Sequence, residues 1–150
     1  MNNKMSRVAT HVYVNQAKEA VEAYKNAFAL ESKNEPQLAD DGALIYQELR
    51  LDGQLFMSIT DYKFLDAEIR NAYPDNTSAG VMLNIVYLSQ TADLKRAFET
   101  LHQEGRPSTG IRYNETESKS IISSDVVFTD KFGVLWHLCV LEDWDSPLLP

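Results

Sequence analysis

The side chains best suited to chemistry in this 150-residue chain are its three histidines. His11 and His137 each lie in an apolar or β-branched run typical of a strand, whereas His102 lies on a predicted helix and is expected to be solvated. An imidazole can bind a divalent metal or transfer a proton near neutral pH. A catalytic metal needs roughly three protein ligands, so two histidines would require a third group to hold one.

Other reactive groups carry weaker signals. Ser58 has no neighbouring His-Asp arrangement in the sequence, so a nucleophilic serine is not supported. Glu48 is the only carboxylate on a predicted strand of the first half that could act in acid-base chemistry, and pairing with Arg50 is the simpler expectation. Cys139 cannot form an internal disulfide, and its apolar surroundings favour a small buried hydrophobe. The six glycines are scattered at turns and form no phosphate-binding loop.

The elements that would position these groups occur twice along the chain. The segment VYVNQ at residues 12–16 is matched by VYLSQ at residues 86–90. Each is followed by apolar residues at helical spacing, over residues 17–28 in the first case and 91–101 in the second. This internal repeat predicts two similar modules that pack side by side, with a ligand cavity at the surface between them.

The remaining elements are predicted to be strands joined by tight turns. An Asp-Gly pair at residues 52–53 and the turn at residues 130–133 each indicate a hairpin. The predicted strands are residues 8–14, 43–51, 54–60, 81–88, 111–113, 121–129 and 134–141. We expect one domain over residues 1–150, with modules over 7–61 and 80–141, a linker over 62–79 and a tail over 142–150.

The composition excludes some partners. The formal net charge of −8 disfavours nucleic acid and anionic membrane surfaces, because affinity for both begins with lysine and arginine. No apolar run approaches the ~20 residues of a membrane span, and the first residues lack the apolar core of a signal peptide. We therefore expect a cytoplasmic location, and the 44% of hydrophobic residues predicts an ordered protein. We expect no cofactor.

Strand alternation predicts which side chains line a cavity. Val12 and Val14 are the apolar partners that the first helix needs, which leaves His11 and Tyr13 on the opposite face. The same reasoning applies to the other strands of both modules. The predicted cavity wall is His11, Tyr13, Phe56, Ser58, Thr60, Tyr87 and His137. Such a wall suits a small, partly apolar or aromatic ligand.

Three stretches resemble the vicinal oxygen chelate superfamily, which includes glyoxalase I, extradiol dioxygenases and bleomycin resistance proteins. They are HVYVNQAKEAVEAY at residues 11–24, GQLFMSITD at 53–61 and TDKFGVLW at 129–136. The likeness is closest to the PhnB-like branch. It implies an α+β fold of two βαβββ modules whose sheets curl into a cup, the glyoxalase/bleomycin-resistance fold, and it also implies a homodimer.

The resemblance also implies where a metal would lie. Metal-dependent members place one ligand on the first and fourth strands of each module, and these positions fall near Ala9, Ser58 and Leu83 and at His137. Only the last of these binds metal well, so we predict no metal. If one is bound, His11 would join His137, because it lies two residues beyond Ala9 on the same side of the strand.

Three functions are compatible with these observations. The leading hypothesis is a PhnB-like protein of unassigned activity that binds a small, partly apolar molecule in the cup without a metal. The first alternative is a metal-dependent lyase or dioxygenase-like enzyme that uses His11 and His137. The second is a structural dimerisation module with a filled cup. The expected partners are a small molecule and a second copy of the chain.

Overall fold

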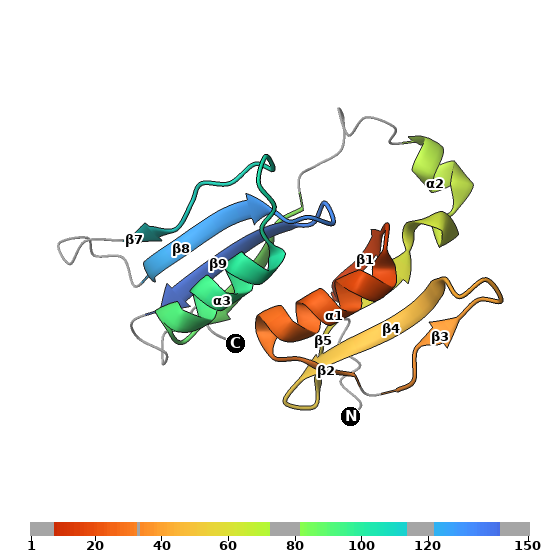
Figure 1. The fold of residues 1–150 in the computed structure, drawn as a ribbon, viewed down its shortest axis with the longest axis horizontal. Coiled ribbons are helices and arrows are strands. Elements are labelled where there is room, and N and C mark those ends of the chain that lie inside the picture. Colours follow the sequence, from red (N-terminus) through yellow and green to blue (C-terminus); the bar gives the residue numbers. More distant parts are fainter. Residues whose placement is uncertain (1–7, 33, 73–81, 114–121, 142–150) are drawn as a thin grey trace, which may run out of the picture.

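A computed structural model describes residues 8–32, 34–72, 82–113 and 122–141. The protein is α+β and consists of two βαβββ modules, each a sheet with one long helix packed on it, as predicted (Figure 1). None of the helices in these ranges is long and apolar enough to cross a membrane.

The first module contains one helix and a sheet in the order β1-β5-β4-β2. Strand β1 is parallel to β5, and the short β3 pairs with β4 outside this path. Its elements are β1 (His11–Val14), α1 (Ala17–Phe28), β2 (Glu31–Ser32), β3 (Gln37–Leu38), β4 (Leu44–Leu51) and β5 (Gln54–Asp61). The predicted helix has the observed bounds, whereas the two-residue strands β2 and β3 were not among the predicted strands.

The second module has the same strand order, β6-β9-β8-β7, with β6 parallel to β9. Its elements are β6 (Asn84–Leu88), α3 (Thr91–Leu101), β7 (Arg112–Tyr113), β8 (Ile122–Thr129) and β9 (Leu135–Leu141). Between the modules lie the 3-10 helix η1 (Tyr62–Phe64) and the short helix α2 (Ala67–Ala72). The end of the predicted linker and the tail at 142–150 lie outside the described residues.

Both predicted hairpins are confirmed. Asp52 and Gly53 have φ angles of 51° and 79°, the pair of positive values that a two-residue turn of this kind needs. In the second hairpin, Gly133 has φ 91°, and the Asp130 N–H donates to the Val134 carbonyl at 2.8 Å. Each hairpin fixes the antiparallel register of the two long strands beside it.

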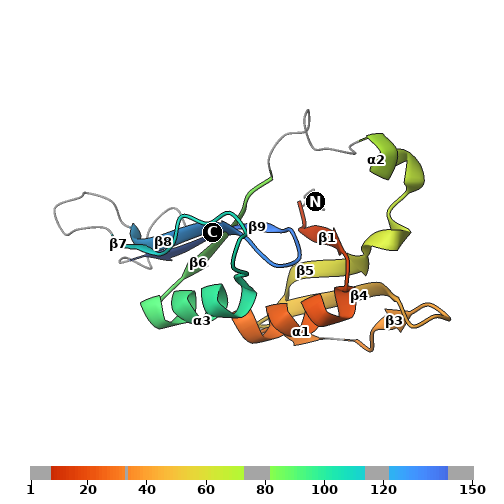
Figure 2. The ribbon, with the colours of Figure 1, turned by 45° about the horizontal axis from the view of Figure 1, so that its top comes forward.

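The core lies between the helices and one face of each sheet. Figure 2 shows α1 and α3 on the same side of the two sheets. Met57 and Ile59 of β5 and Leu138 of β9 are completely buried, which agrees with the alternation predicted for these strands. The opposite face of each sheet carries no helix in the described structure, and we call it the helix-free face.

The modules are joined by a buried carboxylate and an aromatic cluster, and the two described sheets share no strand pair. Fully buried Asp130 of the second module accepts hydrogen bonds from the Tyr24 hydroxyl at 2.7 Å and from the Trp136 indole at 2.8 Å. It also accepts from the backbone N–H groups of Phe132 and Val134. Burial and the negative charge of Asp130 raise the pKa of Tyr24, which belongs to α1. This joint is therefore a packed core and not a ligand site.

Candidate functional site

The seven side chains predicted to line one cavity lie in three places. The first place holds His11, Tyr13, Ser58 and Thr60, the second holds Phe56 and Tyr87, and the third holds His137. We call the first group, with its hydrogen-bond partners, the His11 site, and the third group, with its partners, the His137 site. Within the described residues, no hydrogen bond or ring contact joins the His11 site to the His137 site.

The His11 site is built by the parallel pairing of β1 with β5, which sets His11 opposite Ser58. The His11 Nδ1 lies 2.6 Å from the Ser58 Oγ, and its Nε2 lies 2.9 Å from the Thr60 Oγ1. The Thr60 hydroxyl donates its only hydrogen to the Ile45 carbonyl at 2.8 Å. Thr60 must therefore accept from the Nε2–H of His11, and neutral His11 accepts from Ser58 at Nδ1. Both ring nitrogens are occupied.

The surroundings keep His11 neutral. Burial lowers the pKa of His11. Glu48, on the neighbouring strand β4, accepts hydrogen bonds at 2.7 Å from both the Tyr46 hydroxyl and the Arg50 guanidinium. The pairing of Glu48 with Arg50 is as predicted. The hydrogen bond to Glu48 raises the pKa of Tyr46, whose ring stacks on His11 at 6.1 Å.

Ser58 and His11 are therefore hydrogen-bonded although they are far apart in the sequence. A serine nucleophile requires a base that can accept its proton and hold the resulting charge. Here the third member is the neutral hydroxyl of Thr60, which stabilises an imidazolium much less than a carboxylate does. This arrangement orients the side chains without activating the serine.

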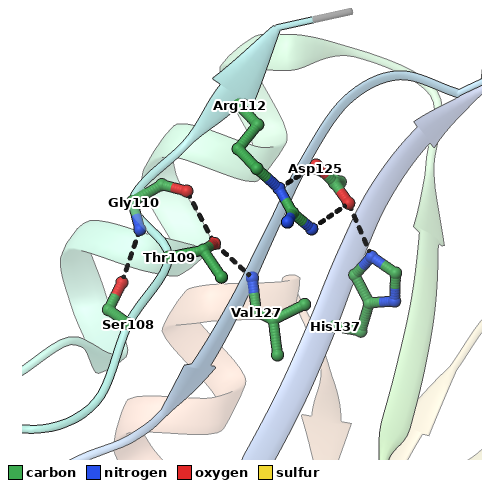
Figure 3. Close-up of polar contacts among 7 residues, drawn as sticks. All are labelled: Ser108, Thr109, Gly110, Arg112, Asp125, Val127 and His137. Carbon is green, nitrogen blue, oxygen red and sulfur yellow. Dashed lines mark hydrogen bonds and ion pairs between the residues drawn. The ribbon is translucent and has the colours of Figure 1, made fainter.

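The His137 site lies on the helix-free face of the second sheet (Figure 3). Asp125 of β8 accepts two hydrogen bonds from Arg112 of β7, at 3.0 Å from Nε and 2.8 Å from Nη2. The Nε2 of His137 lies 2.8 Å from the same carboxylate. Because an ionised carboxylate only accepts, this nitrogen carries the hydrogen. Within the described residues, His137 Nδ1 makes no hydrogen bond, and Figure 3 shows it on the side of the ring toward β6.

Charges in the His137 site are balanced. Burial alone would raise the pKa of Asp125, but hydrogen bonds from Arg112 and His137 outweigh it and lower the pKa. Burial, with a contribution from Asp125, raises the pKa of the Cys139 thiol to about 11. Cys139 is buried, as predicted. The site thus combines the Arg112 cation, the Asp125 anion, a thiol and the His137 ring, whose Nδ1 makes no hydrogen bond within the described residues.

The sequence analysis did not identify Asp125 or its two-point contact with Arg112. A usable signal was present, because Asp125 opens the apolar run Val126, Val127 and Phe128 inside a predicted strand. A carboxylate in a buried strand requires a partner that offsets its desolvation. The strand that carries Arg112 was predicted at residues 111–113, but its register against β8, which sets Arg112 opposite Asp125, could not be predicted from the sequence.

A crevice of about 1030 Å³ runs between the modules along β6 and the start of β5. It is lined by Phe56 and Tyr87 of the predicted set, together with Phe28, Trp136 and other residues of both modules. The ring of Phe56 packs 5.2 Å from that of Phe28 on α1. The crevice lies at the predicted surface between the modules, but neither His11 nor His137 is among its lining residues.

Metal-binding residues do not cluster in the described part of the chain. Over residues 8–32, 34–72, 82–113 and 122–141, no group of three or more His, Cys, Asp or Glu side chains could hold a metal ion.

Comparison with known proteins defines the fold. No family model matches the chain, and no curated protein matches it. Among solved structures, a glyoxylase/bleomycin resistance protein/dioxygenase domain from Frankia sp. EAN1pec is similar, with a TM-score of 0.61 and 13% identity over 94% of this chain and 96% of that one. The protein therefore has the glyoxalase/bleomycin-resistance fold, as predicted.

Two further neighbours indicate the range of proteins that share this fold. A putative 3-demethylubiquinone-9 3-methyltransferase, a PhnB protein from Bacillus cereus, has a TM-score of 0.62 and 20% identity over 90% of this chain and 99% of that one. TnmS3, an antibiotic-binding protein from Streptomyces sp. CB03234, has a TM-score of 0.54 and 14% identity over 94% of this chain and 100% of its own. At these identities the likeness establishes the fold and not the activity.

Proposed function

We propose that this protein binds a small, partly apolar molecule on its helix-free faces without a resident metal ion. The observation that carries the proposal is Nδ1 of His137, which makes no hydrogen bond in the described part of the chain, on a strand position flanked by Ile85 and Val127. Ile85, the register partner of His137 on β6, is 48% exposed. Ligand sites commonly combine an apolar wall with a few fixed polar groups, and this face has both.

The donor set supports the metal-free part of the proposal. Of the four positions at which the superfamily places ligands, those at Ala9 and Leu83 offer no side-chain donor. Ser58 gives its hydrogen to His11, whose two ring nitrogens are both hydrogen-bonded. Coordination by His11 would therefore break an existing hydrogen bond. The residues do not fit a catalytic metal centre, which needs roughly three protein ligands.

The comparisons support the same class of function. TnmS3, which shares the fold, is an antibiotic-binding protein, so this scaffold is used elsewhere to hold a small molecule. The PhnB protein from Bacillus cereus supports placing the chain in the PhnB-like branch. Both likenesses concern the scaffold, and the side chains described above supply the chemistry.

We further propose that the protein is a cytoplasmic homodimer. Several large apolar side chains are at least 40% exposed, which favours a partner surface. Those on the two sheets and their edges, apart from the wall of the His137 site, include Tyr13, Ile45, Leu55 and Leu83. Light scattering during size-exclusion chromatography tests the dimer: a single species with the mass of one chain would contradict it. Cell fractionation tests the location.

A thermal-shift screen tests the binding proposal. Protein treated with a chelator is melted with a panel of metabolites and drugs, because a ligand that binds only the folded state raises the melting temperature. We expect aromatic or amphipathic compounds to raise it, and the shift to shrink in His137→Gln. If no compound stabilises the protein, binding is excluded and a purely structural module is favoured. Stoichiometric metal in untreated protein that is lost in His137→Ala would contradict the metal-free proposal.

A further inference from the structure

We propose that His137, held by Asp125, accepts a proton from the hydroxyl group of an aromatic ligand, so that acidic phenols bind at the His137 site as phenolates. This inference rests on the proposed function and names the ligand class for one of its sites. It goes beyond binding, because it assigns a proton-transfer step to one nitrogen atom of one side chain.

The geometry fixes which nitrogen can act. The Nε2–H of His137 donates to Asp125 at 2.8 Å, so the lone pair of the neutral ring is on Nδ1. A histidine base with a carboxylate behind it is the arrangement that orients the ring and stabilises the imidazolium once it forms. The structure supplies this pair, and Nδ1, which makes no hydrogen bond to any residue that the structure describes, lies on the β6 side of a ring whose side chain is 20% exposed (Figure 3).

Charge balance favours an acidic hydroxyl as the ligand group. Arg112 and Asp125 cancel each other, so the site is neutral while His137 is neutral. In the proposed step the O–H bond of the phenol breaks and an N–H bond forms at Nδ1. The imidazolium and the phenolate then neutralise each other as an ion pair, and the proton returns to the oxygen when the ligand leaves. No further reactant is needed.

The titratable and charged groups around His137 come from each packed strand. Asp125 comes from β8, Arg112 from β7, Cys139 from its own strand and Tyr87 from β6. Of these, Asp125 is the only one whose negative charge touches the ring. A change in proton affinity at Nδ1 is therefore expected to follow Asp125 most strongly.

The walls of the site favour a ring behind the hydroxyl. Ile85 and Val127 are the two register partners of His137, one on each neighbouring strand. Ile85 is about half exposed, and Val127 is partly exposed. A flat aromatic ring can cover both side chains while its hydroxyl meets Nδ1.

The inference is tested with 4-nitrophenol, whose ionised form absorbs visible light while its neutral form does not. The whole protein is titrated with the probe at a pH at which free 4-nitrophenol is mostly neutral. We expect the visible phenolate band to grow as the protein saturates. His137→Gln, which keeps a polar side chain, should lose the band and bind about tenfold more weakly, as expected when a charge-assisted hydrogen bond is lost. Asp125→Asn should weaken the band, and His11→Gln should leave it unchanged.

A matched probe separates proton transfer from simple ring binding. 4-Nitroanisole has the same ring without the hydroxyl, so its affinity, measured by equilibrium dialysis, should not change in His137→Gln. Circular dichroism and melting temperature establish that each variant is folded. A phenolate band that persists in His137→Gln, or 4-nitrophenol that binds without the band, overturns the inference and leaves the proposed function standing. If neither probe nor any compound of the thermal-shift panel binds, the proposed function itself fails.

Discussion

The histidines of the His11 site and the His137 site differ in how many of their ring nitrogens are hydrogen-bonded. His11 bonds Ser58 and Thr60 on the face opposite buried Met57 and Ile59, so it lies on a helix-free face, as His137 does, in two sheets with the same strand order. In the first sheet the histidine is on the first strand and faces Ser58, whereas in the second it is on the fourth strand and faces Ile85. Hydroxyl groups occupy both nitrogens of His11, and one carboxylate occupies a single nitrogen of His137.

This comparison shows that the type of partner decides whether a histidine is available. A hydroxyl can donate or accept, so Ser58 and Thr60 together satisfy both ends of a neutral ring. An ionised carboxylate can only accept, so Asp125 satisfies one end and directs the lone pair of the other outward. Two sheets with the same strand order thus hold one imidazole with both nitrogens hydrogen-bonded and one with a single nitrogen hydrogen-bonded.

Among the substitutions considered, removal of the Asp125 carboxylate from the His137 site should have the largest effect on stability. Asp125→Ala leaves Arg112 and His137 without their common acceptor. We expect a loss of about 2 kcal/mol in the free energy of unfolding, below the value for a fully buried pair because Arg112 is half exposed. Urea unfolding measures the change. Asp125→Asn, which keeps an acceptor oxygen, should lose less, and an unchanged midpoint for Asp125→Ala would show that the carboxylate contributes nothing.

A smaller loss in the free energy of unfolding is expected when the hydrogen bonds of Thr60 in the His11 site are removed. Thr60→Val removes the acceptor for the Nε2–H of His11 and the donor to the Ile45 carbonyl. The expected cost is about 1 kcal/mol, typical of neutral hydrogen bonds. Thr60→Ser, which retains the hydroxyl, is the control in the same urea experiment. Equal losses in the two variants would assign the effect to packing instead.

The two sites should respond to acid in different pH windows. The folded-state pKa of His11 is lowered below its ordinary value of 6.5, so its contribution to stability is complete above 6.5 and is lost as the pH falls through the folded pKa. The pKa of Asp125 is lowered below 3.8, so its contribution is complete above 3.8 and is lost at still lower pH. The free energy of unfolding, measured across this pH range, should no longer change with pH just below 6.5 in His11→Gln. It should still change there in the parent protein and in Asp125→Asn. If Asp125→Asn alters that pH dependence instead, the assignment is wrong.

The smallest expected effect is on the Cys139 thiol. Its pKa of about 11 predicts slow reaction with a thiol reagent near pH 8, because little thiolate forms. Asp125 contributes to that shift after burial, so Asp125→Asn should speed the reaction modestly. His11→Gln is the matched control and should react at the original rate. Rapid labelling of the folded parent protein would contradict the description of this thiol.

Much of the fold was predictable because local patterns were strong. The apolar stripe of α1 and the Asp-Gly turn before β5 are set by residues close together in the sequence. Alternation also placed His11, Ser58 and Thr60 on one face, where the structure brings them together. These features depend on the period of a strand or helix and on backbone preferences at single positions.

The rest of the site depended on contacts that no local pattern encodes. Phe56 was assigned to the cavity face by strict alternation, but the register shifts beside Leu49 and Arg50 and leaves Phe56 as the extra residue of β5. Such a bulge redirects a side chain, and Phe56 packs on Phe28. Asp125 was overlooked because its contact with Arg112 depends on the register between two strands, which no local pattern encodes.

The shared carboxylate at Asp130 has a consequence for how the chain unfolds. Its charge is compensated by Tyr24 from the other half of the molecule, as well as by groups of its own hairpin. A fragment that contains only the second half would keep this anion but lose one of its donors and the aromatic cover over it. The halves should therefore melt together in one cooperative transition, and a duplicated architecture would behave thermodynamically as a single unit.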